Sequence, residues 1–252
     1  MLLSLDADPS SVACRLAQPS NPNAQVWRYM SFARLVWLLS MKQLWFSRAD
    51  LLDDRHEAVI GSAALGTGLT ARPDQPSRDE WLAELKQLRS RLFVNCWHLS
   101  EHESHAMWRV YCGRQDGVAI VASYAALRAS VGPLPIGLVR YDEQLPASAE
   151  QQIQREPIFA TWRKRPMFAY EREIRIGLFD GWFSDWPKQN DGRITLGAPV
   201  DWDPDQIVAR IHVHPDADFS YAEAVNAVLK RFAPRLSVLG VAWSSLSSSP
   251  PY

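Results

Sequence analysis

Short apolar runs rich in β-branched and aromatic residues recur along the chain, and segments with helical spacing lie between them. Residues 25–30 and 43–47 have strand character, and the leucines between them fall at helical spacing after Ser31, a residue type that caps helices well. No repeat or long polar linker divides the 252 residues. We therefore predict a single α+β domain with mixed, mostly antiparallel sheets and flanking helices.

The remaining elements follow from the same periodicities. Further strands are predicted at 91–98, 117–122, 136–141, 171–179, 207–213 and 237–243. Helices are predicted at 77–89, 103–111, 149–162 and 220–232. Residues 1–24 carry three prolines among polar residues, which predicts a flexible N-terminal arm ahead of a domain at 25–252, and 181–200 is expected to be irregular.

Charge and composition exclude several classes of protein. A formal net charge of -1 offers no global field to attract nucleic acid or an anionic membrane, and no apolar run reaches the length of a membrane span. Three cysteines without a CxxC pair are typical of a reducing cytoplasm. We expect a cytoplasmic protein without a membrane partner, and the sequence does not determine its oligomeric state.

A histidine-rich segment, VNCWHLSEHESHAMWRVY, raises the question of a metal site. His98, His102 and His105 are spaced by four and three residues, which on one continuous helix suits zinc. A strand ends near His98, however, and a polar turn follows, so these side chains belong to different elements. His212 and His214 face one side of a strand but are only two ligands. No metal site is expected.

Two segments place charged residues inside predicted strands. In FAYEREIRIGLF, strand alternation sets Glu171 and Glu173 on one face, about 7 Å apart, with Arg175 following. Arg28 stands in the first strand, where a charge needs a partner or water. Arg28 could donate two hydrogen bonds to a phosphate or carboxylate. Alternatively, it could simply lie on the polar side of an edge strand. The acidic face is either a site or a solvated surface with an internal ion pair.

Three segments together resemble a known family. They are VWRYMSF with LWFSRADLLDDRHE, then VNCWHLSEHESHAMWRVY with GVAI, then FAYEREIRIGLF. The chain resembles the bacterial family known as domain of unknown function 2971, over about Val26 to Val213. The block SHAMWRVY and the double-glutamate strand are its most specific parts.

The order of residues is also similar to the Arg, Ser and Glu-x-Glu arrangement of ADP-ribosyltransferases. This resemblance implies an ADP-ribosyltransferase-like fold and NAD as a substrate. By the same similarity Arg28 would hold the phosphates or ribose of NAD, Ser47 would order the site, and Glu173 would be the catalytic acid with Glu171 beside it. The remaining residues assigned to NAD binding are Tyr29, Arg48, Trp97, His98 and Tyr111.

The resemblance therefore implies an NAD-dependent ADP-ribosyltransferase or NAD glycohydrolase, acting in bacterial conflict or phage defence on a protein or nucleic-acid acceptor. One alternative is a non-catalytic module that binds a nucleotide or nucleic acid, with Arg163, Lys164 and Arg165 beside Trp162 as its basic patch. Another is a metal-dependent nuclease. Its candidate ligands are Asp50, Asp53, Asp54, Glu57, Glu171 and Glu173.

Overall fold

The computed structural model describes residues 8–58, 83, 86–113, 116–143, 148–149, 152–153, 156–182 and 196–247. Its centre is an eight-stranded sheet in which every pairing between named strands is antiparallel. Its strands are β1 (Gln25–Ser31), β2 (Gln43–Arg48), β3 (Leu92–Leu99), β4 (Gly117–Ser123), β5 (Ile136–Leu138), β8 (Glu173–Phe179), β9 (Gly197–Asp201) and β10 (Arg210–Val213). A separate parallel pair joins β6 (Arg140–Tyr141) to β7 (Arg163–Lys164). The predicted α+β class with mostly antiparallel sheets is confirmed.

Short helices surround this sheet. The α-helices are α1 (Pro9–Ala13), α2 (Phe32–Met41), α4 (His105–Cys112), α5 (Tyr124–Ser130), α7 (Pro204–Ile207), α8 (Phe219–Phe232) and α9 (Pro234–Leu239). The 3-10 helices are η1 (Ala49–Leu51), η3 (Pro157–Trp162), η4 (Pro166–Glu171), η5 (Asp180–Trp182) and η7 (Ser245–Ser247). Among the described residues, none of the helices has the length and apolar character needed to cross a membrane.

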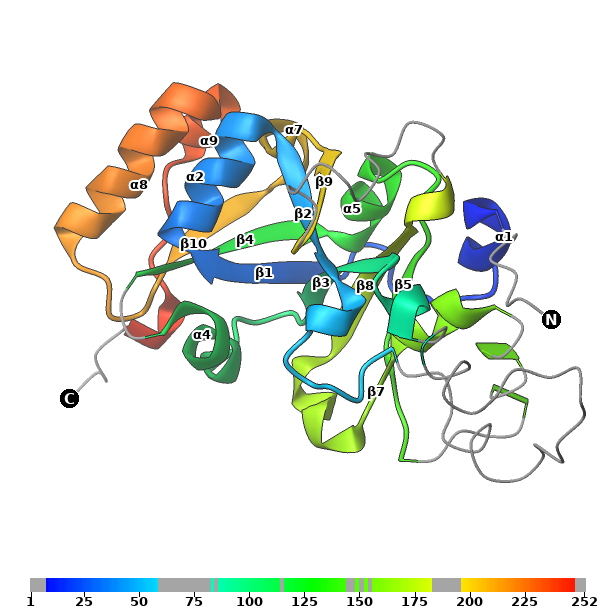
Figure 1. Ribbon diagram of the computed structural model, residues 1–252. Coiled ribbons are helices and arrows are strands. Elements are labelled where there is room, and N and C mark those ends of the chain that lie inside the picture. Colours follow the sequence, from blue (N-terminus) through cyan, green and yellow to red (C-terminus); the bar gives the residue numbers. More distant parts are fainter. Residues whose placement is uncertain are drawn as a thin grey trace, which may run out of the picture.

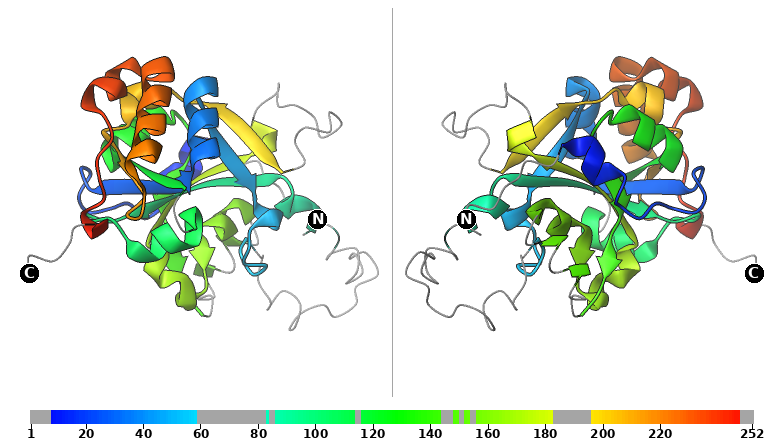
Figure 2. Two further views of the ribbon diagram at one scale, coloured as in Figure 1. Left: turned by 90° about the vertical axis from the view of Figure 1, so that its left-hand side faces the viewer. Right: turned by 90° about the vertical axis from the view of Figure 1, so that its right-hand side faces the viewer.

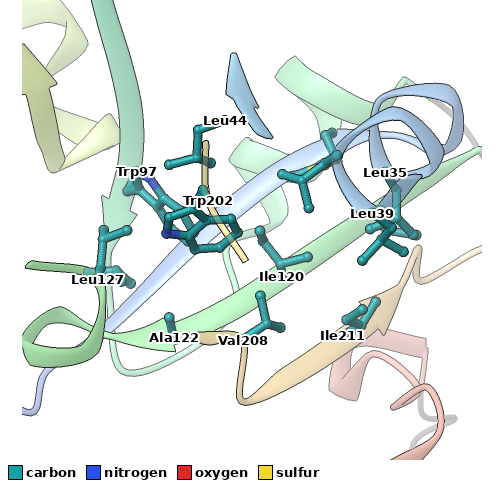
Figure 3. Close-up of a cluster of buried hydrophobic side chains, with 14 of the residues drawn as sticks. Leu35, Leu39, Leu44, Trp97, Ile120, Ala122, Leu127, Trp202, Val208 and Ile211 are labelled. Atoms are coloured by element: carbon teal, nitrogen blue, oxygen red, sulfur yellow. The ribbon is translucent and has the colours of Figure 1, made fainter. Parts of the chain in front are cut away.

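One face of the sheet, called here the first face, is mostly apolar, with Asn95 and Arg28 as its polar side chains near Trp97. Helices α2, α8 and α9 lie on this side and α4 on the other, in both the front and the side views (Figure 1, Figure 2). The indole rings of Trp97 and Trp202 meet with centroids 6.1 Å apart, amid leucine, isoleucine and valine side chains (Figure 3). Ser31 caps α2 by accepting from the amide of Arg34, as its position predicted.

The opposite, second face is divided. Helix α4 covers β1 and β4 with a small aromatic cluster around Trp27, Tyr29 and Trp108. A separate apolar cluster lies beneath η3 and includes Leu92, Trp162 and Phe179. Charged and polar side chains of β3 and β8 lie on the same face as both clusters. The cross-strand pairs on this face are Leu92–Phe179, Val94–Gly177, Cys96–Arg175 and His98–Glu173.

Strand β3 is where the sheet splits, because two strands share one of its edges. The pairs are Val26–Leu99 and Trp27–His98 with β1, and Ser47–Val94 and Arg48–Phe93 with β2. Within the described residues, neither strand pairs with 95–97 on that edge. Side chains bridge this gap, since Asn95 Nδ2 donates to the main-chain oxygen of Trp45 at 2.9 Å. Asn95 and Trp97 in this stretch are each 1% exposed, so side chains fill the gap.

Several predicted elements differ from those observed. Residues 234–239 form helix α9, with Pro234 at its first position, in place of a strand at 237–243. The strand predicted at 136–141 is divided between β5 and β6. In the predicted flexible arm, α1 buries Val12, and Gln18 Nε2 donates to the Ile136 carbonyl at 2.9 Å. Most of the predicted helix at 77–89 lies outside the described residues.

Candidate active site

A charged cluster occupies the second face around the ammonium group of Lys164. Lys164 Nζ lies 2.6 Å from Glu171 Oε2, 2.9 Å from Glu173 Oε1 and 3.1 Å from Glu57 Oε1. The exposed fraction of each of these four side chains is 6% or less. Because buried charges need partners, this convergence is the main electrostatic feature of the second face.

Arg175 completes the cluster from the next position on the same face of β8. Its Nε donates to Glu173 Oε2 at 2.6 Å and its Nη2 to Glu173 Oε1 at 3.1 Å. Nη2 also contacts Glu57, and Nη1 donates to the Thr161 carbonyl at 2.8 Å. Both oxygens of Glu173 are thus held by cations, an arrangement that fixes the carboxylate in one orientation.

The backbone brings the two glutamates together in a way that the sequence did not predict. Glu171 is the last residue of η4, and Glu173 is the first of β8. Between them Arg172 is exposed and left-handed, with φ 41°. The prediction of two carboxylates on one strand is therefore wrong in its geometry, and so is the alternative of a solvated acidic face. The carboxyl groups are hydrogen-bonded to each other.

The two carboxyl groups have opposite proton affinities. Burial, and then Glu173, raise the pKa of Glu171 to about 7, although Lys164 opposes the shift. Burial also acts to raise the pKa of Glu173, but Arg175 and Lys164 outweigh it and lower that pKa far below its ordinary value. A pair of this kind presents one fixed anion and one carboxyl that can exchange a proton near neutral pH.

Arg28 lies at the split between β1 and β3, on the side of the first face. Its Nη2 donates to the Trp45 carbonyl at 3.4 Å, and its guanidinium lies 5.9 Å from the centre of the Trp97 ring. Within the described part of the chain, nothing accepts from Nη1, which is shielded from solvent. Burial lowers the pKa of Arg28 to about 10. A buried donor without a partner is costly, so this position is suited to an anionic ligand.

Arg28 and the acid pair do not touch, but they share two neighbours. Cys96 and Tyr111 each interact electrostatically with Arg28 and with Glu173. Cys96 is half-buried on β3, and Tyr111 on α4 is 41% exposed. Arg28 lies over Trp97 on the first face and Glu173 pairs with His98 on the second, so the guanidinium and the carboxyl pair are on opposite faces of the sheet.

The other predicted residues surround this arrangement. Ser47 pairs with Val94 and so points to the second face. His98 is buried, its Nδ1 is 2.6 Å from the Glu171 carbonyl, and its ring meets Tyr29 edge-on. Trp97, in contrast, is 1% exposed and belongs to the core of the first face, while Arg48 is paired with Asp50. These last two side chains are engaged in packing and an ion pair.

The residues proposed for the two alternatives are engaged elsewhere. Asp50 pairs with Arg48 and Asp54 with Arg165, and the ammonium of Lys164 occupies the point where Glu57, Glu171 and Glu173 meet. In the parts of the chain that the structure describes, no group of three or more His, Cys, Asp or Glu residues suits a metal ion.

The basic patch of the second alternative is not a free surface. Arg163 pairs with Asp142, Arg165 pairs with Asp54, and Lys164 is enclosed by carboxylates. Trp162 is buried and donates to the Arg175 carbonyl at 3.0 Å. A nucleic-acid surface at this segment would require breaking these pairs.

A family model described as "Protein of unknown function (DUF2971)" matches residues 107–176. The match shows what this segment of the chain is similar to. The resemblance read from the sequence, over about Val26 to Val213, is confirmed for this shorter stretch. The DUF2971 segment contains Tyr111, Lys164, Glu171, Glu173 and Arg175, and therefore all of the charged cluster except Glu57. No curated protein matches the chain significantly.

Solved structures of DarT from Thermus sp. 2.9 resemble the chain. The DarT chain in the complex with ADP-ribosylated ssDNA is 14% identical in sequence. The match covers 86% of this chain and 91% of the DarT chain, with a TM-score of 0.38. The complex with carba-NAD+ is 13% identical, with coverages of 84% and 91% and a TM-score of 0.39. The complex with NAD+ is 14% identical, with coverages of 86% and 92% and a TM-score of 0.38. Similarity at this level does not place individual residues.

Sequence reasoning did not single out Cys96, and it named Glu57 and Lys164 only in the nuclease and binding-module alternatives. Lys164 lies between two arginines and looked like part of a charged turn, and Glu57 looked like part of an acidic turn. Cys96 directly precedes Trp97 on a strand that was recognised. Strand alternation, once β3 and β8 are paired, places Cys96 opposite Arg175, and that is the signal that could have found it.

Proposed function

We propose that the chain is an NAD-dependent ADP-ribosyltransferase or NAD glycohydrolase, with the ribose of NAD beside the Glu171–Glu173 pair. The observation that carries the proposal is the buried Glu171–Glu173 pair, in which Lys164 and Arg175 hold Glu173 as a fixed anion. A fixed carboxylate suits a reaction that develops positive charge, and a guanidinium suits phosphate.

In the reaction we propose, the bond between nicotinamide and ribose breaks, and its electron pair leaves with nicotinamide. The ribose then carries oxocarbenium-like positive charge, as in glycoside cleavage, and the ionised Glu173 stabilises it. Water or an acceptor attacks the ribose carbon and gives up a proton, which the unprotonated form of Glu171 accepts. The half-exposed ring of Tyr111 offers an apolar surface beside the carboxyl pair.

Arg28 would hold the pyrophosphate, and Ser47 and His98 would order the second face beside the ribose. Trp97 and Arg48 would act only through packing and charge near the ligand. We propose a cytoplasmic protein, since all three cysteines are free thiols. The acceptor, either protein or nucleic acid, and the setting of bacterial conflict or phage defence are proposed on the family resemblance.

The test is to incubate the purified protein with NAD+ and a bacterial extract and to quantify free nicotinamide and transferred ADP-ribose. Glu173→Gln removes the fixed anion and is expected to lower nicotinamide release about 100- to 1,000-fold. Glu156→Gln, at an ion pair with Arg15 outside the site, is the matched control and is expected to act like the wild type. Absence of nicotinamide release and transfer by the wild type would overturn the proposal.

The unpaired Arg28 donor also favours a second candidate, a nucleotide-binding module without catalysis. Calorimetric titration with NAD+ separates the two. Saturable binding that Arg28→Met weakens, together with no release of nicotinamide over hours, would select the binding module.

A further inference from the structure

The position of Lys164 sets how the carboxyl pair shares its proton. Three carboxylates, from Glu57, Glu171 and Glu173, converge on one ammonium group, and Arg175 is the second cation of the cluster. Three negative charges face two positive charges, so one carboxyl either holds a proton or leaves the buried cluster with a net negative charge. Burial favours the proton, because an uncompensated buried charge is costly.

The hydrogen bonds indicate which carboxyl holds that proton. Both oxygens of Glu173 accept from cations, whereas the described contacts give Glu171 only Lys164 as a cationic partner. A hydrogen bond between two carboxyl groups requires a proton on one of them, and the group with fewer cationic partners keeps it more easily.

We propose that Lys164 is a positioning residue for the transferase reaction, whose ammonium keeps Glu173 ionised and leaves the exchangeable proton on Glu171. This inference rests on the proposed function. It assigns a task to a residue that touches neither the developing charge nor the acceptor. Lys164 acts through both glutamates, since its single ammonium group contacts each of them.

Among the described residues, the titratable and charged groups that face Glu171 are Glu173, Lys164, Tyr111, Tyr141 and Tyr170. Glu57 contacts the same ammonium group and is the other carboxylate that competes for it. Burial is the main cause that raises the pKa of all three tyrosines, so their hydroxyls stay protonated at neutral pH. From β3, His98 meets only the main-chain carbonyl of Glu171.

A titration without any ligand tests the assignment directly. In protein labelled with carboxyl-¹³C glutamate, NMR is expected to show one buried carboxyl that titrates near neutral pH. Lys164→Met should raise that midpoint by at least one pH unit, a tenfold gain in proton affinity. Arg163→Met is the matched control, because Arg163 precedes Lys164 on β7 and pairs with Asp142 outside the cluster. The control should leave the midpoint unchanged.

A second variant keeps the test decisive if Lys164→Met does not fold. Glu57→Gln removes a competing carboxylate, which frees Lys164 and Arg175 for the glutamate pair, so the same midpoint should fall. An unchanged midpoint in Lys164→Met, or an upward shift in Glu57→Gln, would overturn the inference.

Activity then supplies an independent readout. With NAD+, the acidic limb of the rate against pH should move upward in Lys164→Met by the same amount as the NMR midpoint. It should return toward the wild-type position in Lys164→Arg, which restores the positive charge. Wild-type protein that shows the carboxyl titration but never releases nicotinamide would reject the proposed function and leave the proton assignment intact.

Discussion

The two faces of the central sheet solve burial in different ways. On the first face, alternate residues of β8 are Ile174, Ile176 and Leu178, and each is fully buried in one apolar core. On the second face the same strand presents Glu173 and Arg175, which are buried as deeply. Adjacent residues of one strand thus enter opposite environments, one stabilised by burial of apolar area and one dependent on ion pairing.

The two faces differ in how much a buried side chain contributes to the stability of the fold. An apolar face gains free energy from nearly any well-packed side chain of the right volume. Buried ion pairs gain little over apolar replacements, and they become strongly destabilising when one partner is lost. A chain that keeps five buried charges on one face has a chemical reason to do so, and the exchangeable proton on Glu171 is the reason we propose.

Arg175→Met should have the largest effect on stability. The change keeps the length of the side chain but removes one of the two cations that contact both Glu173 and Glu57, so that Lys164 alone remains for three carboxylates. We expect the free energy of unfolding to fall by about 3–5 kcal/mol at pH 7. The loss should be smaller at pH 4, where a carboxyl freed from its cation takes up a proton. Urea denaturation at both pH values measures this, and an equal loss at the two would show that packing alone is involved.

Much of the first face follows from sequence, because local signals decide it. The Ser31 cap, the leucine spacing of α2 and the branched residues of β4 are each visible within a few residues of the element that they define. The strand at 237–243 was predicted wrongly because its two valines and one leucine suit a strand, and the prediction did not use Pro234, a good first residue for a helix.

The second face follows from sequence only in part. Arg28, Glu171 and Glu173 are recognisable as charges in strand-like segments, but their partners come from far along the chain. Lys164 is buried on β7, which pairs with β6, and Glu57 reaches Arg175 across 118 residues of sequence. The left-handed backbone at Arg172 could not be predicted from the sequence, because arginine rarely adopts that conformation. Contacts between residues far apart in the sequence therefore determine which side chains form the site.

The proton on Glu171 should make stability depend on pH. Because the folded pKa of this carboxyl is raised from 4.5 to about 7, its contribution is complete below about pH 4.5 and is lost as pH rises through about 7. Burial lowers the pKa of His98, His212 and His214, which gives the opposite slope over the same range. The difference between wild type and a variant isolates Glu171.

In Glu171→Gln, the free energy of unfolding should rise more steeply, or fall less, between pH 5 and 7. The difference in slope can reach about 1.4 kcal/mol per pH unit, the limit for one proton. Chemical denaturation at four pH values in this range measures it. If the free energy of unfolding has the same pH dependence in the wild type and in Glu171→Gln, the exchangeable proton is not on Glu171.

Ile176→Val is the counterpart of Arg175→Met on the first face. The residues are adjacent on β8, but Ile176 loses only one buried methylene group from an apolar core. We expect destabilisation by about 1 kcal/mol, with no difference between pH 4 and pH 7. Urea denaturation with the same protocol checks this. A pH-dependent loss at Ile176 would mean that the two faces are electrostatically coupled.

The smallest expected effect concerns two of the left-handed residues, one at the end of α2 and one at the carboxyl pair. Lys42 ends α2 with φ 52°, and Arg172 separates the two glutamates with φ 41°. Glycine adopts this conformation without the steric cost of a Cβ atom, so Lys42→Gly and Arg172→Gly should each stabilise the fold by a few tenths to about 1 kcal/mol. Denaturation midpoints measure both. Only Arg172→Gly should also broaden or shift the Glu171 titration, because a more mobile backbone between the carboxyl groups weakens their hydrogen bond. If Lys42→Gly shifts that titration equally, the turn at Arg172 has no special part in positioning the pair.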